Sequence, residues 1–310
     1  MIMTEKRAIF VTGATGAQGG AVVDALMNSG FAIRALVRDP ASEAAQALAM
    51  RDVELVTGDF DDATSLKTGV SGAYGVFSVQ TPPRPDDLDS EVRIAGKLVD
   101  AAHAAGVEIF VHTSVARAGE HESFSGWQEG RWWPRYWTSK AEVNEIVRKA
   151  GFPRYTILKP AYMMDNFITP KSQWMYPGLA KRGAIETAMA EDTRLDLIAA
   201  SDVGRFAAAA FAEPDRFSGQ EIDLAAESLT MQEVAKAITT STGKAVAVKH
   251  MSGKQAREMG NSPGLTESQQ WARVEGYKVD LTQAASHGVP LERISDWSQR
   301  MRDRFCIGPE

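Results

Sequence analysis

Three glycines near the N-terminus have the spacing that a turn around a dinucleotide pyrophosphate requires. Gly13, Gly16 and Gly19 form a G-x-x-G-x-x-G pattern between an apolar run at residues 8–11 and a helical pattern. Gly13 would permit a tight turn, Gly16 would let the backbone approach the pyrophosphate, and Gly19 would let the helix pack closely on the strand. The helix N-terminus would then present unpaired N–H groups to the phosphates. The pattern alone is often a flexible turn, but its strand–turn–helix context predicts dinucleotide binding.

A tyrosine and a lysine farther along the chain are candidates for proton transfer. Tyr136 and Lys140 are four residues apart, so on a helix they share one face, and the apolar stripe continues through Val143 and Val147. A lysine in an inward-facing apolar stripe is unexpected without a partner, and the ribose of a bound cofactor would supply one. The cation would lower the pKa of the phenol, which could then donate or accept the proton that accompanies hydride transfer. Ser114 could hydrogen-bond the same substrate oxygen. Alternatively, the tyrosine is a packing residue.

An arginine after the second expected strand bears on the choice of cofactor. Arg38 lies about twenty residues beyond the glycine turn, where an acidic residue would bind the 2′-hydroxyl of NAD and an arginine suits the 2′-phosphate of NADP. Asp39 is adjacent, and Arg38 could instead be a solvated charge, but we favour NADP(H) over NAD(H). Asp59 and Phe60 could border the adenine, or could be a helix cap and a core aromatic.

The elements that must position these residues alternate between strand-like and helix-like patterns. Strand patterns occur at residues 8–11, 32–37, 53–56, 73–79, 108–113 and 155–158. Helical patterns lie between several of them, at residues 42–50, 86–105 and 136–149. Such alternation indicates a parallel sheet covered on both faces, and six strands match the doubly wound Rossmann architecture of the α/β class.

The pattern loosens after Pro160, which suggests a second part of the molecule. We expect a Rossmann domain at residues 1–160 and a smaller C-terminal α/β lobe at residues 161–310, partly interleaved with the Rossmann sheet. Two helix N-caps are predicted in the second half, Asp202 and Thr230, the latter in a capping box.

Aromatic and methionine side chains concentrate in two segments that could form a substrate pocket. Residues 127–137 hold four of the seven tryptophans together with two arginines. Base stacking uses aromatics interleaved with cations, but the acidic chain argues against nucleic acid. A pocket wall for a flat organic substrate is the alternative we favour, formed by Trp133, Tyr162, Met163, Phe167, Trp174 and Tyr176. These side chains could instead pack on the core or form a dimer contact, and methionine is often core filler.

The composition limits the partners and the location. The formal net charge is −6, so no global field attracts nucleic acid or an anionic membrane. No run of about 18 apolar residues is present, so no membrane-spanning helix is expected. Residues 1–7 contain no long apolar segment of a secretory signal. Cys306 is the single cysteine, which excludes a disulfide framework, and the scattered histidines suggest no metal site. A cytoplasmic location is therefore expected.

Several motifs together resemble one family. The NmrA-like branch of the atypical short-chain dehydrogenase/reductases is similar to this chain over about residues 7–250, through VTGATGAQGG, ALVRDP, GDFDD, YWTSKAEV, LKPAYMMDNF and ASDVGRFAAAAF. The resemblance implies a Rossmann domain, a small C-terminal lobe and a preference for NADP(H). The family includes NADPH-dependent quinone reductases and isoflavone-reductase-like enzymes. It also includes redox sensors that bind a dinucleotide, lack catalysis and regulate transcription through a partner.

The resemblance also implies a set of cofactor contacts. The pyrophosphate would be held by Gly13, Thr15, Gly16, Ala17, Gln18 and Gly19. The 2′-phosphate would be bound by Arg38, and the adenine would be bordered by Asp59 and Phe60. Lys140 would contact the nicotinamide ribose. The nicotinamide half would be bordered by Gln80, Thr81, Pro160, Ala161 and Tyr162.

These observations predict an NADP(H)-dependent oxidoreductase that passes hydride to a small aromatic carbonyl, enone or quinone. Non-catalytic members of the family typically lack the tyrosine but keep the lysine, whereas this chain has Tyr136, Lys140 and Ser114. The alternative is a non-enzymatic NADP(H)-binding redox sensor that regulates transcription through a protein partner. A homodimer or a regulatory partner is compatible with the sequence, and direct binding of nucleic acid or membrane is not expected.

Overall fold

The computed structural model of the protein describes residues 6–27 and 29–309. Residues 1–5, which carry most of the segment that argues against a secretory signal, lie outside the described residues. The chain forms two compact units, each assembled from separate stretches of sequence. Unit 1 combines the N-terminal stretch to Gly119 with Arg135–Lys159 and Ala200–Ile222. Unit 2 combines Glu120–Pro134, Pro160–Ala199 and the stretch from Asp223 onward.

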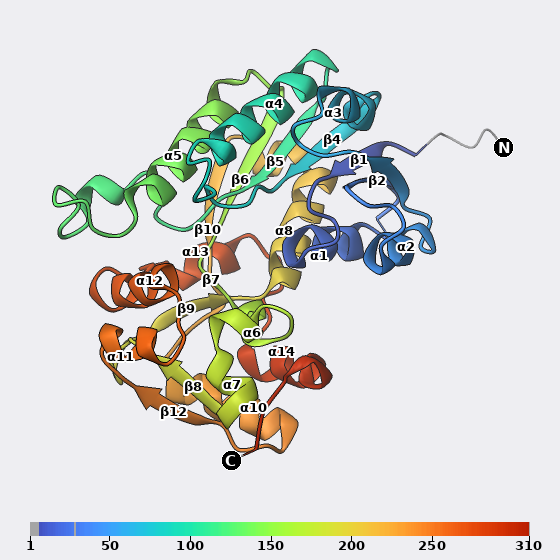
Figure 1. The fold of residues 1–310 in the computed structure, drawn as a ribbon. Helices are drawn as coiled ribbons and strands as arrows, with labels where there is room; N and C mark the ends of the chain where they lie inside the picture. The colour runs from blue at the N-terminus through green and yellow to red at the C-terminus, as the bar shows by residue number, and fades with distance from the viewer. Residues whose placement is uncertain (1–5, 28, 310) are drawn as a thin grey trace. The chain divides into compact units, whose positions relative to one another are not determined.

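Unit 1 is built on a seven-stranded sheet with the strand order β10-β6-β5-β4-β1-β2-β3 (Figure 1). Its strands are β1 (Ala8–Val11), β2 (Ala32–Val37), β3 (Glu54–Thr57), β4 (Ala73–Ser78), β5 (Ile109–Thr113), β6 (Arg154–Pro160) and β10 (Gln220–Leu224). The successive pairs from β3 to β6 are all parallel. The order reverses at β1, the point outside whose carboxyl end ligands bind in doubly wound sheets. The predicted α/β Rossmann fold is therefore confirmed.

The sequence predicted six of these strands and missed β10. This strand joins the sheet only after the chain has passed through Pro160–Ala199 of unit 2, so the alternation in the first half does not reveal it. The helices of unit 1 are α1 (Ala17–Leu26), α2 (Glu43–Ala49), α3 (Ala63–Val70), α4 (Ser90–Ala104), α5 (Pro134–Lys149), α8 (Ala200–Ala212) and α9 (Pro214–Phe217).

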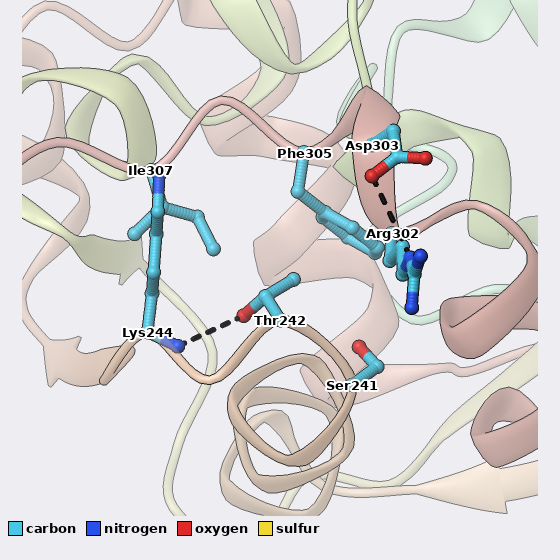
Figure 2. Close-up of a pocket in the computed structure, with 7 residues that line it drawn as sticks. All are labelled: Ser241, Thr242, Lys244, Arg302, Asp303, Phe305 and Ile307. Carbon is cyan, nitrogen blue, oxygen red and sulfur yellow. Dashed lines mark hydrogen bonds and ion pairs between the residues drawn. The ribbon is translucent and has the colours of Figure 1, made fainter.

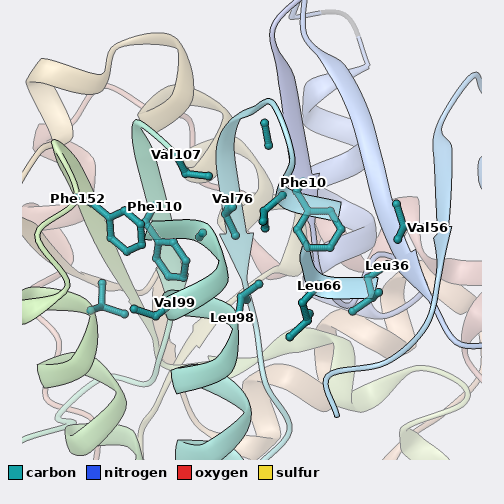
Figure 3. Close-up of a cluster of buried hydrophobic side chains, with 14 of the residues drawn as sticks. Phe10, Leu36, Val56, Leu66, Val76, Leu98, Val99, Val107, Phe110 and Phe152 are labelled. Atoms are coloured by element: carbon teal, nitrogen blue, oxygen red, sulfur yellow. The ribbon is translucent and has the colours of Figure 1, made fainter. Parts of the chain in front are cut away.

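Apolar side chains cover both faces of the sheet. Phe10, Leu36 and Phe110 belong to one buried cluster with residues of α3, α4 and α5, so these helices lie on that face (Figure 3). On the other face α8 packs against α1 so closely that a Cβ built on Gly204 would lie 2.3 Å from the carbonyl oxygen of Ala21. A buried core on each face therefore holds the carboxyl ends of the strands in place.

Some helix starts differ from the sequence prediction. α4 begins at Ser90 rather than near residue 86, because the N–H of Asp87 first donates to the carbonyl of Arg84 in a turn. α8 begins at Ala200, so Asp202 lies in its first turn rather than at its N-cap, and its buried carboxylate pairs with Arg205. α3 escaped prediction, although Asp62 caps it by accepting from the N–H of Thr64 at 2.9 Å.

Unit 2 contains small sheets and short helices. The sheets have the strand orders β11-β9-β7 and β12-β8. Their strands are β7 (Tyr162–Met163), β8 (Ala184–Thr187), β9 (Leu195–Ile198), β11 (Glu227–Leu229) and β12 (Ala247–His250). The α-helices are α6 (Ser172–Met175), α7 (Pro177–Arg182), α10 (Met231–Thr242), α11 (Gly253–Glu258), α12 (Pro263–Val274), α13 (Leu281–Ser286) and α14 (Ile294–Arg300). The predicted capping box of Thr230 with Glu233 is confirmed at α10. Within the described residues, no helix is long and apolar enough to cross a bilayer.

Candidate functional site

The glycine turn lies at the carboxyl end of β1, where α1 begins. Gly13 has a φ of 63°, a left-handed conformation that favours glycine. A Cβ on Gly19 would lie 2.2 Å from the carbonyl oxygen of Gly13, so the helix can start this close to the turn only with glycine there. At Gly16, the N-cap of α1, the nearest atom to such a Cβ is 3.3 Å away. The packing of the protein therefore requires glycine at 13 and 19 but much less at 16.

The first turn of α1 is suited to an anion. No side chain caps it, and it contains no acidic residue. Thr15 and Gly16 are exposed and Ala17 is partly exposed, so a ligand can reach this helix end, where the N–H of Gly16 itself donates to the carbonyl of Gly13 at 2.9 Å. Gln18 is already engaged, because its Oε1 accepts from the hydroxyl of Thr113 at 2.7 Å. Only the amide N–H groups of its side chain remain for a phosphate.

The residues predicted around the adenine and its ribose follow β2 and β3. Arg38 is exposed and has no ion-pair partner within the part of the chain that the structure describes. The carboxylate of Asp39 accepts from the N–H of Ala41 at 2.9 Å and so shapes the turn before α2. Asp59 accepts similarly from two N–H groups of its own loop, and Phe60 packs on the buried cluster of the sheet. Arg38 is therefore the predicted residue here whose side chain has no evident structural role.

A hydrogen-bonded chain joins the ends of β4 and β5. The side-chain amide of Gln80 donates to Ser78 Oγ at 2.9 Å, and Ser78 Oγ lies 3.2 Å from Nδ1 of His112. Burial, together with the nearby Lys140 cation, lowers the pKa of His112 to about 3. The imidazole is therefore neutral at physiological pH. Thr81, the residue after Gln80, is exposed.

Buried polar atoms without a partner gather at the same two strand ends. Within the described residues, no hydrogen-bond partner is found for Oε1 of Gln80, Oγ of Ser114 or Nε2 of His112. Ser114 directly follows β5, and its backbone N–H donates to Leu158 at 2.8 Å. A buried polar atom left unpaired is costly, and such atoms point to a group that binds beside them.

Lys140 is paired inside the protein. Its Nζ lies 2.6 Å from Oε1 of Glu91 in α4, and the Glu91 side chain is only 1% exposed. The other carboxylate oxygen of Glu91 accepts from the Ser139 hydroxyl at 2.6 Å. The partner that a lysine in this apolar stripe requires is therefore present in the protein itself, as Glu91, and not only in the ribose considered from the sequence. The lysine can still contact a ribose, because an ammonium has three N–H donors.

The Tyr136 ring lies next to this ion pair, with its centroid 5.9 Å from the Nζ of Lys140. Burial raises the pKa of the Tyr136 phenol; Lys140 opposes this effect and Glu91 adds to it. The predicted net lowering of the phenol pKa was therefore wrong, because burial outweighs the effect of the lysine and Glu91 opposes the lysine as well. A phenol with a raised pKa stays protonated at neutral pH, which suits the donation of a proton.

The aromatic residues predicted around the substrate lie in unit 2, in two different environments. Tyr162, Phe167 and Tyr176 pack together: the two tyrosine hydroxyls are 2.7 Å apart, and the rings of Phe167 and Tyr176 stack at 4.8 Å. Phe167 and Tyr176 are fully buried, so they belong to the core of the unit. By contrast, Trp174 is 59% exposed, and Met163 is partly exposed. Pro160 and Ala161, which precede this cluster, are buried.

The part of the tryptophan-rich segment up to Pro134 is anchored within unit 2. The backbone N–H of Trp133 donates to Glu267 of α12 at 2.9 Å, and the indole of Trp132 donates to the carbonyl of Ser125. Trp132 is buried, whereas Trp133 is 39% exposed. The segment is therefore held by contacts with other residues of unit 2, and Trp133 is the member of the predicted pocket that it exposes.

Two cavities lie apart from the predicted site residues. One of about 590 Å³ lies beside α3 and α4 in unit 1. Another of about 430 Å³ in unit 2 is bordered by Lys244 and Arg302 with an apolar wall of Phe305 and Ile307 (Figure 2). No predicted site residue lines either one. Within the described residues, no group of three His, Cys, Asp or Glu side chains is arranged to hold a metal ion.

Sequence reasoning missed two residues at the candidate site, Glu91 and His112. A signal for Glu91 was present, since it lies on the buried stripe of α4 with Ile94 and Leu98. An acid in an apolar helical stripe is the counterpart of the lysine in the stripe of α5. His112 carried no such signal, because all five residues of β5 are buried and its neighbours are not informative.

The chain is similar to known proteins over most of its length. The model of the NmrA-like family matches residues 5–288. The NAD(P)H azoreductase of Xenophilus azovorans is 29% identical over 262 residues, which cover 84% of this chain and 82% of the relative. Quinone oxidoreductase 2 of Escherichia coli (strain K12) is 26% identical over 262 residues, with 84% and 83% covered.

Solved structures share the fold at lower identity. NmrA, a negative transcriptional regulator solved in complex with NADP, aligns with a TM-score of 0.74 at 20% identity, over 97% of this chain and 96% of its own. The triphenylmethane reductase of Citrobacter sp., complexed with NADP(H), aligns with a TM-score of 0.74 at 21% identity, over 96% of this chain and 99% of its own. The shared fold thus occurs both in a reductase and in a regulator.

Proposed function

Because the chain belongs to the NmrA-like family, we propose that it is an NADPH-dependent oxidoreductase that transfers hydride to a small, flat organic acceptor. Relatives named as an azoreductase, an NmrA-like oxidoreductase and a quinone oxidoreductase support an oxidoreductase enzyme. For the acceptor we propose an aromatic carbonyl, an enone or a quinone. The observation that carries the proposal is the glycine turn, which places the exposed Gly16 at an N-terminus of α1 that no side chain caps.

The residues at the carboxyl edge of the sheet fit a dinucleotide. The open N–H groups of α1 suit a pyrophosphate, and Arg38 suits a 2′-phosphate. The unpartnered oxygen of Gln80 is a buried acceptor at the end of β4, where the nicotinamide half would lie. The carboxamide N–H₂ of a nicotinamide is a hydrogen-bond donor, which is what the unpartnered oxygen of Gln80 requires.

In this proposal each side chain has a separate role. Bound NADPH would supply the hydride. Tyr136, kept protonated by its buried position, would donate the proton to the acceptor oxygen, and the Ser114 hydroxyl would hold that oxygen. Lys140 would use the N–H donors that Glu91 leaves available to hold the ribose. Of the side chains predicted for a substrate pocket, Trp133, Trp174 and Met163 are the ones that unit 2 leaves partly or largely exposed.

The proposal is tested by following NADPH oxidation with a panel of quinones, enones, aromatic aldehydes and azo dyes. We expect turnover with at least one acceptor class, with NADPH preferred to NADH. Tight NADPH binding without turnover of any acceptor, together with a change in conformation between the oxidised and reduced cofactor, would contradict the enzyme and favour the redox sensor.

Replacing Arg38 with alanine should remove most of the preference for NADP(H). A charge-assisted hydrogen bond contributes about 1.5–3 kcal/mol, or roughly ten- to hundredfold in affinity. The unmodified protein should bind NADPH more tightly than NADH by this factor, and the variant should bind both about equally. Titration of tryptophan fluorescence with each cofactor measures the dissociation constants.

Arg51→Ala is the matched control for this substitution. Arg51 is also exposed, but it pairs with Asp24 and lies in the turn before the amino end of β3, whereas Arg38 follows the carboxyl end of the parallel strand β2. Its removal should leave the ratio of the two affinities unchanged. Equal affinities for NADPH and NADH in the unmodified protein would refute the role of Arg38.

A further inference from the structure

We propose that Glu91 is a positioning residue of this reaction: its buried carboxylate holds the Lys140 ammonium and the Ser139 hydroxyl at once, and so sets the charge beside Tyr136. The inference rests on the proposed function, in which Tyr136 donates the proton and Lys140 contacts the ribose. The inference extends the proposed function because it assigns the position of the Lys140 ammonium, and the charge next to the Tyr136 phenol, to a residue on a different helix.

The contacts define one fixed arrangement. Glu91 stands in the first turn of α4, where the helix dipole favours a carboxylate. Each of its two oxygens has one partner on α5, at 2.6 Å in both cases. Since Ser139 and Lys140 are adjacent, the two contacts fix the rotation of α5 and the position of the ammonium. Tyr136 lies one helical turn before Lys140, so its ring is positioned by the same contacts.

Stability alone does not account for two charges at this position. A buried ion pair can often be replaced by apolar residues of similar volume without loss of stability. The surrounding stripes of α4 and α5, which include Ile94, Leu98 and Val143, would accept such residues. The carboxylate of Glu91 and the ammonium of Lys140 have opposite effects on the pKa of the neighbouring Tyr136 phenol. The ion pair is therefore suited to setting the pH at which that phenol loses its proton.

The direction of the electrostatic effect is the same for both groups that Glu91 faces. The carboxylate raises the pKa of the Lys140 ammonium and the pKa of the Tyr136 phenol. His112 of β5 also faces Lys140, but its pKa of about 3 keeps it neutral across the relevant range. Removal of the Glu91 charge should therefore lower both pKa values, so that Tyr136 loses its proton at a lower pH.

The first test uses the cofactor-free protein and needs no substrate. Tyrosinate absorbance is recorded during an alkaline titration of the unmodified protein and of Glu91→Gln, each with and without Tyr136→Phe. For each protein, the titration curve of the form with Tyr136→Phe is subtracted from that of the form with Tyr136. The difference is the titration of Tyr136 alone. In Glu91→Gln we expect its midpoint to fall by about one to three pH units, the usual effect of a close charge.

Asp100→Asn is the matched control, because Asp100 is an exposed acid on the same helix. It makes the same change of net charge and should leave the midpoint of Tyr136 in place. If Glu91→Gln does not fold, as judged by circular dichroism, Glu91→Asp retains the charge at a shorter reach and should lower the midpoint by a smaller amount. An unchanged midpoint in the folded Glu91 variant would overturn the proposal.

The second test follows kcat/KM against pH with the acceptor found in the panel. In Glu91→Gln the loss of activity at alkaline pH should begin about one to three pH units lower, whereas Asp100→Asn should follow the unmodified profile. A lower kcat/KM with an unshifted profile would indicate a merely structural role and would overturn the proposal. If no acceptor is turned over, the proposed function fails, but the titration still decides whether Glu91 controls Tyr136.

Discussion

Turnover should fall about 10²–10⁴-fold when Tyr136 is replaced by phenylalanine, the usual contribution of a positioned acid. The substitution keeps the ring and its edge-to-face contact with Trp137 at 5.2 Å, and removes only the hydroxyl that would donate the proton. Affinity for NADPH should barely change, because the phenol is not a proposed cofactor contact. The measurement combines kcat for the active acceptor with the dissociation constant of NADPH from tryptophan fluorescence.

Tyr155→Phe provides the comparison, since Tyr155 of β6 is a partly buried tyrosine that packs on the core cluster of the same unit. It should retain full activity. Lys140→Ala should reduce both turnover and cofactor affinity, but it leaves Glu91 buried without its cation. Breaking such a pair costs about 3–5 kcal/mol, so thermal unfolding of this variant must be measured first. Full activity in Tyr136→Phe would exclude the tyrosine from the mechanism.

The strands of unit 1 from β1 to β6 could be predicted because they follow one another in the sequence and alternate with helices. Apolar runs such as residues 32–37 end at turn residues, and the observed strand β2 has these bounds. The prediction failed where the order of the sequence and the order in space separate. β10 reaches the sheet from the second half of the chain, and Glu120–Pro134 belongs to unit 2 although it interrupts the sequence of unit 1.

The candidate site could be predicted residue by residue, but not as a network. Gly13 and Gly19 could be recognised because the backbone at these positions has no room for a side chain, so the sequence must contain glycine there. The type of Lys140 and its place in a stripe were visible, but its partner lies on another helix, 49 positions earlier at Glu91. The pKa of the Tyr136 phenol is raised chiefly by burial, with a further contribution from Glu91, and the sequence revealed neither effect.

Exposure was the other property that residue types did not reveal. The aromatic residues expected to line a pocket include Phe167 and Tyr176, which are fully buried, and Trp174, which is largely exposed. All of them are apolar rings in a segment without regular periodicity. No helical or strand period separates an inward from an outward face there, so core and surface members look alike in the sequence.

Binding of NADPH should weaken by more than about a hundredfold when Gly16 is replaced by valine. The branched side chain would occupy the space in which a pyrophosphate approaches the N–H groups of α1. Loss of two such charge-assisted hydrogen bonds amounts to about 3–6 kcal/mol, and about 2.7 kcal/mol already corresponds to a hundredfold change in affinity. The fold should remain, because the N-cap backbone is extended and the contact of an added Cβ with the carbonyl oxygen of Gly13, at 3.3 Å, requires a shift of only a few tenths of an ångström.

Gly19→Val and Gly96→Val separate a lost ligand contact from a lost fold. A Cβ at Gly19 would meet the carbonyl oxygen of Gly13 at 2.2 Å, so that variant should lose stability as well as binding, whereas no atom lies within 4 Å of a Cβ at Gly96 in α4. Circular dichroism melting and fluorescence titration should therefore give three patterns: Gly96→Val stable and binding, Gly16→Val stable and not binding, Gly19→Val neither. Unchanged affinity in a folded Gly16→Val would mean that the turn does not hold the phosphates, and the open helix end would then need another explanation.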